Sequence, residues 1–196
     1  MDKKFKLIID SFGKDRFKFD EPLKDYTALH IGGPAKLFFI AFTTDELVKI
    51  IGMCRDLNLP LFLFGTGSKI MISDVGFNGL VIKNRTKNIQ TISVKGKVSR
   101  FGIGVEEALV EVDSGVSMSK FAEELEKQNL SAEGFKGTPG SIGGNLLVNS
   151  FLQSKAKSIK VLSENIEIED TDPGSLNMKR HIILSAIFRI KAKDEI

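Results

Sequence analysis

The stretch 61-LFLFGTGSKI-70 runs from an apolar segment into a loop of two glycines, two hydroxylated residues and a lysine. Small residues in a row let several backbone N–H groups point at one anion, and Lys69 could add a positive charge. The ATP-binding phosphate loop is excluded, because Ser68 separates Gly67 from Lys69. The dinucleotide fingerprint G-x-G-x-x-G is excluded too, since Ile70 stands where its third glycine belongs. Taken alone, the loop predicts either another kind of anion site or an ordinary tight turn.

The segments around this loop predict a small α/β unit. Apolar residues recur at helical spacing up to residue 57, with Thr43 or Thr44 as the helix cap and Pro60 as the stop. Strand, helix and strand in this order indicate mixed α and β structure. The expected elements are a helix at 5–13, a connecting arm at 15–23, a strand after the turn at 32–34, a helix at 44–57 and strands at 59–64 and 79–84.

The second half predicts a second unit with its own glycine cluster, 134-GFKGTPGSIGGN-145. We place the boundary near 84–88, which divides the chain into domains 1–86 and 87–196. The expected elements are a hairpin over 89–98 that turns at Lys95-Gly96-Lys97, a strand at 108–116, a helix at 118–130 capped by Ser117 and a final strand at 180–190.

Composition narrows the class of protein. The 196 residues are 42% hydrophobic and 27% charged with a net charge of +3, which is ordinary for a globular protein. Basic residues form no run flanked by aromatics, so we expect no nucleic-acid partner. The sequence shows neither a secretory leader nor an apolar run of membrane-spanning length, so we expect a soluble cytoplasmic protein without a membrane partner. Cys54 follows the helical apolar pattern and is expected in the core.

The two glycine clusters are more informative together than either is alone. The segment 138-TPGSIGGN-145 can present backbone N–H groups without side-chain obstruction, as the loop at 65–70 can. Two such loops, each closing one unit, predict two sides of an elongated diphosphate ligand.

At this point the sequence resembles the UDP-N-acetylenolpyruvoylglucosamine reductases (UDP-N-acetylmuramate dehydrogenases), flavoenzymes of peptidoglycan precursor synthesis. The resemblance covers about residues 22–150, and three segments carry it in order and with similar spacing. They are 26-YTALHIGGPA-35, 45-DELVKIIGMCRDLNLPLFLFGTGSKIMISDVGFNGLVI-82 and 132-AEGFKGTPGSIGGNLLVN-149. The resemblance implies an α+β fold of two FAD-binding subdomains, of the vanillyl-alcohol-oxidase (PCMH) type, with FAD between them.

The resemblance also implies which residues hold FAD. The two loops would bind the pyrophosphate, Asn149 would lie beside the flavin and Ile183 would lie along the cofactor. The implied cofactor residues are Gly65, Thr66, Gly67, Ser68, Lys69, Ile70, Pro139, Gly140, Ser141, Ile142, Gly143, Gly144, Asn149 and Ile183. No metal ligand is expected.

The chain departs from the family pattern at several positions. Lys69 replaces the family's Asn, and 150-SFLQ-153 replaces its Ala-Gly-Ala-Tyr-Gly stretch. The segment 175-SLNMKRHIIL-184 lacks the family's Tyr-Arg-x-Ser motif, and no counterpart of its third, substrate-binding domain follows. Proton donation to a substrate needs a positioned acid. Arg180, His181 and Glu133 are the remaining candidates, and we assign none of them.

These departures leave the activity open. The chain could be an FAD-dependent NAD(P)H oxidoreductase that uses NADPH and a UDP-sugar. It could instead be a catalytically inactive flavin-binding or interaction protein, or it could need a separate chain that supplies the substrate domain.

Overall fold

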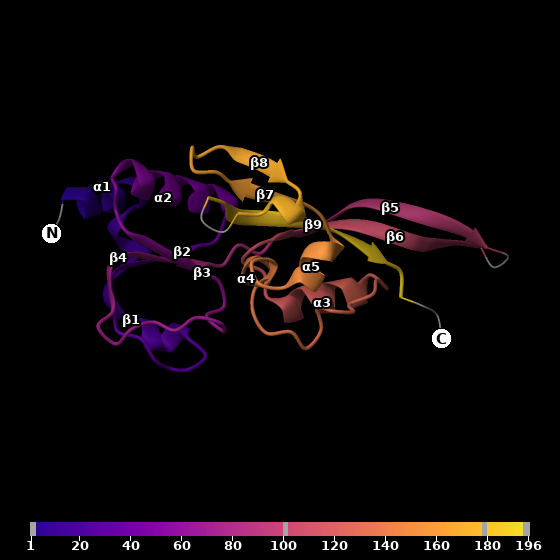
Figure 1. Ribbon diagram of the computed structural model, residues 1–196, viewed down its shortest axis with the longest axis horizontal. Coiled ribbons are helices and arrows are strands. Elements are labelled where there is room, and N and C mark those ends of the chain that lie inside the picture. The colour runs from indigo at the N-terminus through magenta and orange to yellow at the C-terminus, as the bar shows by residue number, and fades with distance from the viewer. Residues whose placement is uncertain (1–2, 100–101, 178–179, 194–196) are drawn as a thin grey trace. The chain divides into compact units, whose positions relative to one another are not determined.

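The computed structural model describes residues 3–99, 102–177 and 180–193. The chain divides into two compact units, Met1–Thr86 and Lys87–Ile196, each with its own sheet and core (Figure 1). No helix in the described ranges is long and apolar enough to cross a membrane.

The first unit is a four-stranded sheet in the order β1-β2-β4-β3. Strands β2, β3 and β4 are parallel, and β1 runs antiparallel to β2 at the edge. Its elements are α1 (Lys3–Phe12), η1 (Lys14–Arg16), β1 (Phe17–Pro22), η2 (Leu23–Tyr26), β2 (Pro34–Ala41), α2 (Thr44–Asp56), β3 (Leu61–Phe64) and β4 (Phe77–Asn84).

Alternating side chains of β2 pack into two different parts of this unit's core, one on each face of the sheet. The ring of Phe39 packs against Phe12 at the end of α1, with a centroid distance of 5.1 Å. The neighbouring Phe38 points to the opposite face and packs against Tyr26 at 4.5 Å. Successive residues of a strand point to opposite faces, so both faces of this sheet are covered.

The helix α2 begins where the sequence predicts. The side chain of Thr43 accepts a hydrogen bond from the N–H of Glu46, at 3.2 Å, and caps the first turn. Cys54 is fully buried, as expected for a core residue. The predicted connecting arm at 15–23 is wrong, because most of it forms β1, whose Phe17 pairs with Phe39 of β2. A partner distant in sequence decides this strand, and local pattern alone does not show it.

The second unit is an antiparallel sheet in the order β5-β6-β9-β7-β8. Three aromatic rings, those of Phe121, Phe135 and Phe188, pack against one another between α3, the following loop and β9. The elements are β5 (Ile89–Ser99), β6 (Gly102–Asp113), α3 (Met118–Lys127), α4 (Ile142–Leu146), α5 (Ser150–Lys155), β7 (Ala156–Leu162), β8 (Ile168–Thr171), η3 (Pro173–Ser175) and β9 (Ile182–Lys191).

The predicted hairpin turn at Lys95-Gly96-Lys97 is wrong. These residues lie inside β5, which continues to Ser99 and forms a long two-stranded ribbon with β6 (Figure 1). Lys95 pairs with Glu107 and Gly96 with Val105, so the register shifts here and Glu106 of β6 is the extra residue of a bulge. The prediction also missed β7, β8 and the two short helices α4 and α5, which lie in segments with weak apolar periodicity.

Candidate functional site

The first glycine loop follows β3 directly and is packed against the segment after η2. Gly67 has a φ of 77°, in the left-handed region, and a Cβ there would overlap the carbonyl oxygen of Tyr26. The N–H of Ala28 also donates to the carbonyl oxygen of Gly67, at 3.1 Å. The fold alone therefore requires glycine at position 67, independently of any ligand.

Four consecutive N–H groups of this loop make no hydrogen bond with the described residues. Within the described part of the chain, the amides of Gly65 to Ser68 donate no hydrogen bond. Successive amides around a left-handed residue form a concave arrangement that binds anions. The hydroxyls of Thr66 and Ser68 lie 3.0 Å apart at its rim. Lys69 is exposed, while the next residue, Ile70, packs against the first unit's core, so the last two residues of the predicted loop have different surroundings.

The second loop is more constrained than its sequence suggests. Ser141 caps α4, and its hydroxyl accepts from the N–H of Gly144 at 3.3 Å. The amide of Ile142 donates to Val116 at 2.8 Å, and that of Gly143 donates to the carbonyl of Ser114 at 2.9 Å.

Two amides of this loop are left for a ligand. Those of Gly140, whose φ is 114°, and Ser141 donate no hydrogen bond to any described residue. The carbonyl of Gly140 accepts from the N–H of Met118 at 2.9 Å and ties the bend to the start of α3. The loop therefore offers two free amides among the six predicted residues.

The glycines of the second loop have different surroundings. A Cβ at Gly143 would lie 2.8 Å from the Cβ of Ser114, so this position is closed by the protein itself. A Cβ at Gly144 would meet only the hydroxyl of Ser141, at 3.3 Å, and the residue is exposed.

Asn145, in α4 just after the second loop, is a residue whose role the sequence analysis missed. Its side chain is fully buried, and its amide nitrogen donates to the carbonyls of Pro139 (3.1 Å) and Ser141 (3.0 Å). It therefore holds the bend of the loop in shape. A signal was present, because a polar residue followed by the apolar run 146-LLV-148 needs partners when it is buried.

The other two predicted cofactor residues, Asn149 and Ile183, make structural contacts within the second unit. The side-chain oxygen of Asn149 accepts from the N–H of Leu152, at 3.2 Å, and caps α5. Ile183 is 6% exposed and belongs to the hydrophobic core. Contact of these residues with FAD stays a prediction.

Asp113 is a buried carboxylate that directly precedes Ser114, the residue whose carbonyl accepts from Gly143 of the second loop. Burial raises its pKa, while the N–H of Asn88 donates to it at 2.9 Å and opposes the rise. Ser114, which follows it, accepts from Gly143. Asp113 and Ser114 therefore belong to the hydrogen-bonded segment that anchors the second loop.

The candidate acids have partners of their own. The Nδ1 atom of His181 accepts from the N–H of Asn177 at 3.3 Å, and its Nε2 lies 3.9 Å from Glu169. Arg180 lies 3.9 Å from Glu164, and Glu133 is exposed in a loop. These are ordinary hydrogen bonds and ion pairs between neighbouring residues of the fold. They identify none of the three residues as a catalytic acid.

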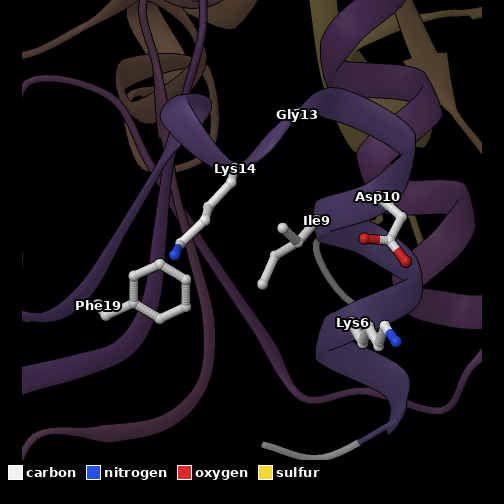
Figure 2. Close-up of a pocket in the computed structure, with 6 residues that line it drawn as sticks. All are labelled: Lys6, Ile9, Asp10, Gly13, Lys14 and Phe19. Atoms are coloured by element: carbon white, nitrogen blue, oxygen red, sulfur yellow. The ribbon is translucent and has the colours of Figure 1, made fainter.

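The first unit also contains a cavity of about 640 Å³ between α1 and β1 (Figure 2). Ile9 and Phe19 contribute apolar surface to its lining, and Lys6, Asp10 and Lys14 contribute charged side chains. The lining residues are Lys6, Ile9, Asp10, Gly13, Lys14 and Phe19, none of which belongs to either glycine loop. The glycine loops therefore remain the candidate site.

The fold and the loops together define a class of protein, the FAD-binding flavoproteins with the vanillyl-alcohol-oxidase (PCMH) fold. The chain belongs to the family described as "FAD binding domain", whose pattern matches residues 35–158. This range includes both glycine loops, and it confirms FAD as the cofactor and the α+β fold class.

Relatives and solved structures agree with this family. The chain is 34% identical over 161 residues to a UDP-N-acetylenolpyruvoylglucosamine reductase of Lachnoclostridium phytofermentans, covering 79% of this chain and 49% of the relative. The chain spans about half the length of the curated relatives it matches. It resembles the fold of a 4-ethylphenol oxidase from Gulosibacter chungangensis, with a TM-score of 0.65, 13% identity and coverage of 98% and 43%. It also resembles the fold of a p-cresol methylhydroxylase, with a TM-score of 0.60 and 10% identity. That match covers 100% of this chain and 45% of the other. At these identities the two structures show the fold alone.

Proposed function

We propose that the chain holds the diphosphate of FAD with the backbone N–H groups of its two glycine loops, Gly65–Ile70 and Pro139–Gly144. The observation that carries the proposal is the run of unbonded amides from Gly65 to Ser68 around the left-handed Gly67. The unbonded amides of Gly140 and Ser141 support the second contact. The flavin would supply the redox chemistry, and the chain would bind and orient it.

The spectrum of the purified protein tests this proposal. We expect flavin absorbance after incubation with FAD, and we expect the cofactor released on denaturation to be FAD and not FMN. Binding by way of a diphosphate also predicts that FAD binds more tightly than riboflavin. A titration with FAD that changes neither absorbance nor fluorescence would overturn the proposal.

We further propose that the chain serves the reduction of a UDP-sugar in peptidoglycan precursor synthesis, with NADPH as the electron donor. The support is its similarity to relatives named UDP-N-acetylenolpyruvoylglucosamine reductase. A cytoplasmic location belongs to the same proposal, because NADPH is a cytoplasmic reductant.

The 196 residues by themselves are not expected to perform this reaction at a useful rate. The segment 175-SLNMKRHIIL-184 lacks the family's Tyr-Arg-x-Ser motif, and His181 is held by Asn177 and Glu169 in a structural setting. A separate chain that supplies the substrate-binding part, or a flavin-binding role without catalysis, fits the same residues.

Steady-state assays separate these alternatives. We expect no oxidation of NADPH that depends on UDP-N-acetylenolpyruvoylglucosamine when the FAD-loaded chain is tested alone. Substrate-dependent turnover would contradict this expectation and would direct mutagenesis to Arg180, His181 and Glu133.

A further inference from the structure

Lys83 lies at the end of β4, beside the point where the first glycine loop begins. It pairs in register with Ile40 of β2 and with Phe64 of β3, and Phe64 is followed directly by Gly65. Ligands of parallel sheets bind beyond the carboxyl ends of the strands, which is where this lysine lies.

The ammonium group of Lys83 rests on aromatic rings. Its Nζ lies 4.9 Å from the ring centre of Tyr26 and 5.3 Å from that of Phe64. Within the described residues, it has no carboxylate within 4.0 Å and no hydrogen-bond acceptor. The side chain is half-buried, and burial lowers its pKa, with the charge of Arg85 acting in the same direction.

The neighbouring carboxylate is already neutralised. Glu21 accepts a hydrogen bond from Lys18, at 2.7 Å, and a second from the hydroxyl of Tyr26. Glu21 therefore does not serve as the counter-charge of Lys83, although both groups lie next to the same tyrosine. A half-buried cation without a counter-charge is costly, and an anion placed beside it would relieve the cost.

Tyr26 links this cation to the glycine loop. The carbonyl of Tyr26 packs against Gly67, and its ring lies under Lys83. The unbonded amides of Gly65 to Ser68 and the unpaired ammonium therefore flank one residue.

We propose that Lys83 is an anion-binding residue that complements the diphosphate held by the amides of the loop at 65–70. This inference rests on the proposed function, because it takes the diphosphate of FAD as the anion. The aromatic rings of Tyr26 and Phe64 position the ammonium, and Arg85 adds a second cation on the same strand end.

Binding measurements with Lys83→Met and Lys83→Arg test the assignment. The methionine keeps the apolar contact with the two rings and removes the charge. We expect Lys83→Met to weaken the binding of FAD and of ADP at least tenfold, to leave riboflavin binding unchanged and to reduce the salt dependence of FAD binding. Lys83→Arg should retain most of the affinity, since its charge is kept.

Lys49→Met is the matched control. The Nζ of Lys49 lies 4.7 Å from the ring centre of Phe12, so this variant also removes a cation from an aromatic ring of the first unit. Lys49 lies on α2 and its Nζ also donates to the carbonyl of Ser11 at 3.3 Å, so it contacts α1 and not the glycine loop, and we expect the affinity for FAD and ADP to be unchanged.

The outcomes separate this inference from the proposed function. Equal FAD and ADP affinities in Lys83→Met and the natural protein would overturn the role of Lys83 and leave the proposed function standing. Binding of ADP but not of FAD, with a loss in Lys83→Met, would support Lys83 as an anion site and reject the FAD proposal. A lower melting temperature of the apoprotein together with equal losses for riboflavin and FAD would show a structural role and overturn the inference. A natural protein that binds neither FAD nor ADP overturns both.

Discussion

The glycines of the two loops differ in what a side chain would meet. Gly67 and Gly143 are closed by the chain itself, by the carbonyl of Tyr26 and by Ser114 respectively. Gly144 is exposed, and only the hydroxyl of Ser141 lies near it. Substituting the closed glycines would damage the fold and ligand binding together, so Gly144 is the position at which the two effects separate.

Gly143→Ala should lower the free energy of unfolding by about 1–3 kcal/mol, because its Cβ would lie 2.8 Å from that of Ser114. Gly144→Ala should change it by less than roughly 1 kcal/mol, since alanine favours the helix and the serine hydroxyl can shift. Urea unfolding of the apoproteins measures both values.

Gly144→Leu extends this comparison to the cofactor. We expect it to keep the fold and to weaken FAD binding, because the larger side chain would start beside the Ser141 hydroxyl, next to the loop amides that we propose bind the diphosphate. Full FAD affinity in a folded Gly144→Leu variant would mean that this part of the loop does not face the cofactor.

Asp113 predicts a pH dependence of stability. Its pKa in the folded protein is raised above 3.8, chiefly by burial, so the folded state binds more protons than the unfolded chain just above pH 3.8. Stability therefore falls as the pH rises through the folded-state pKa, and the ionised form costs stability at pH 7. Asp113→Asn should be more stable than the natural protein at pH 7, with the gain vanishing below about pH 3.8.

Chemical denaturation at several pH values checks this sign. The carboxamide oxygen of the variant can still accept the N–H of Asn88, so the hydrogen bond is matched. A variant that is less stable at pH 7 and unchanged in acid would show that Asp113 stabilises the fold as an anion.

At the scale of single elements, α2 shows how local signals and distant partners combine. Thr43 caps the helix from its own sequence, while Glu46 accepts hydrogen bonds from the Phe42 N–H (2.9 Å) and the Arg16 side chain (2.7 Å). The guanidinium of Arg16 lowers the pKa of Glu46, with burial opposing. The start of α2 is therefore tied to the segment just before β1.

Thr43→Ala should lower the free energy of unfolding by about 1 kcal/mol at any pH, because it removes the cap.

Glu46→Gln should lower the free energy of unfolding at pH 7 but not in acid. The depressed pKa of Glu46 contributes stability that is present above pH 4.5 and is lost as the pH falls through the folded-state value. Unfolding curves at neutral and acidic pH compare the two variants, and a pH-independent loss in Glu46→Gln would contradict the ionic contribution.

At the scale of the whole molecule, each unit has its own sheet and core and carries one glycine loop. A ligand that binds only the folded state raises the free energy of unfolding by RT ln(1 + [L]/Kd), where [L] is the free ligand concentration. FAD at about a hundred times its dissociation constant should add roughly 2.7 kcal/mol. For a chain of this size we expect the melting temperature to rise by roughly 5–10 °C.

Differential scanning fluorimetry or calorimetry measures this shift, with riboflavin as the control that lacks the diphosphate. Riboflavin should give a much smaller rise at the same concentration. Equal shifts for the two compounds would mean that the loops do not hold the diphosphate.

The sequence by itself determined the α+β class, the caps of α2 and α3, the two glycine loops and, through its family resemblance, FAD as the cofactor. These features depend on short-range patterns: apolar spacing, cap residues and glycine clusters. Only the tertiary structure decided that residues 17–22 form a strand, that Gly96 lies inside β5 and that Asn145 supports the second loop. It also decided which amides of the loops are already bonded and that Lys83 lies over two rings without a counter-charge. Such contacts join residues far apart in the chain, so no local pattern carries them.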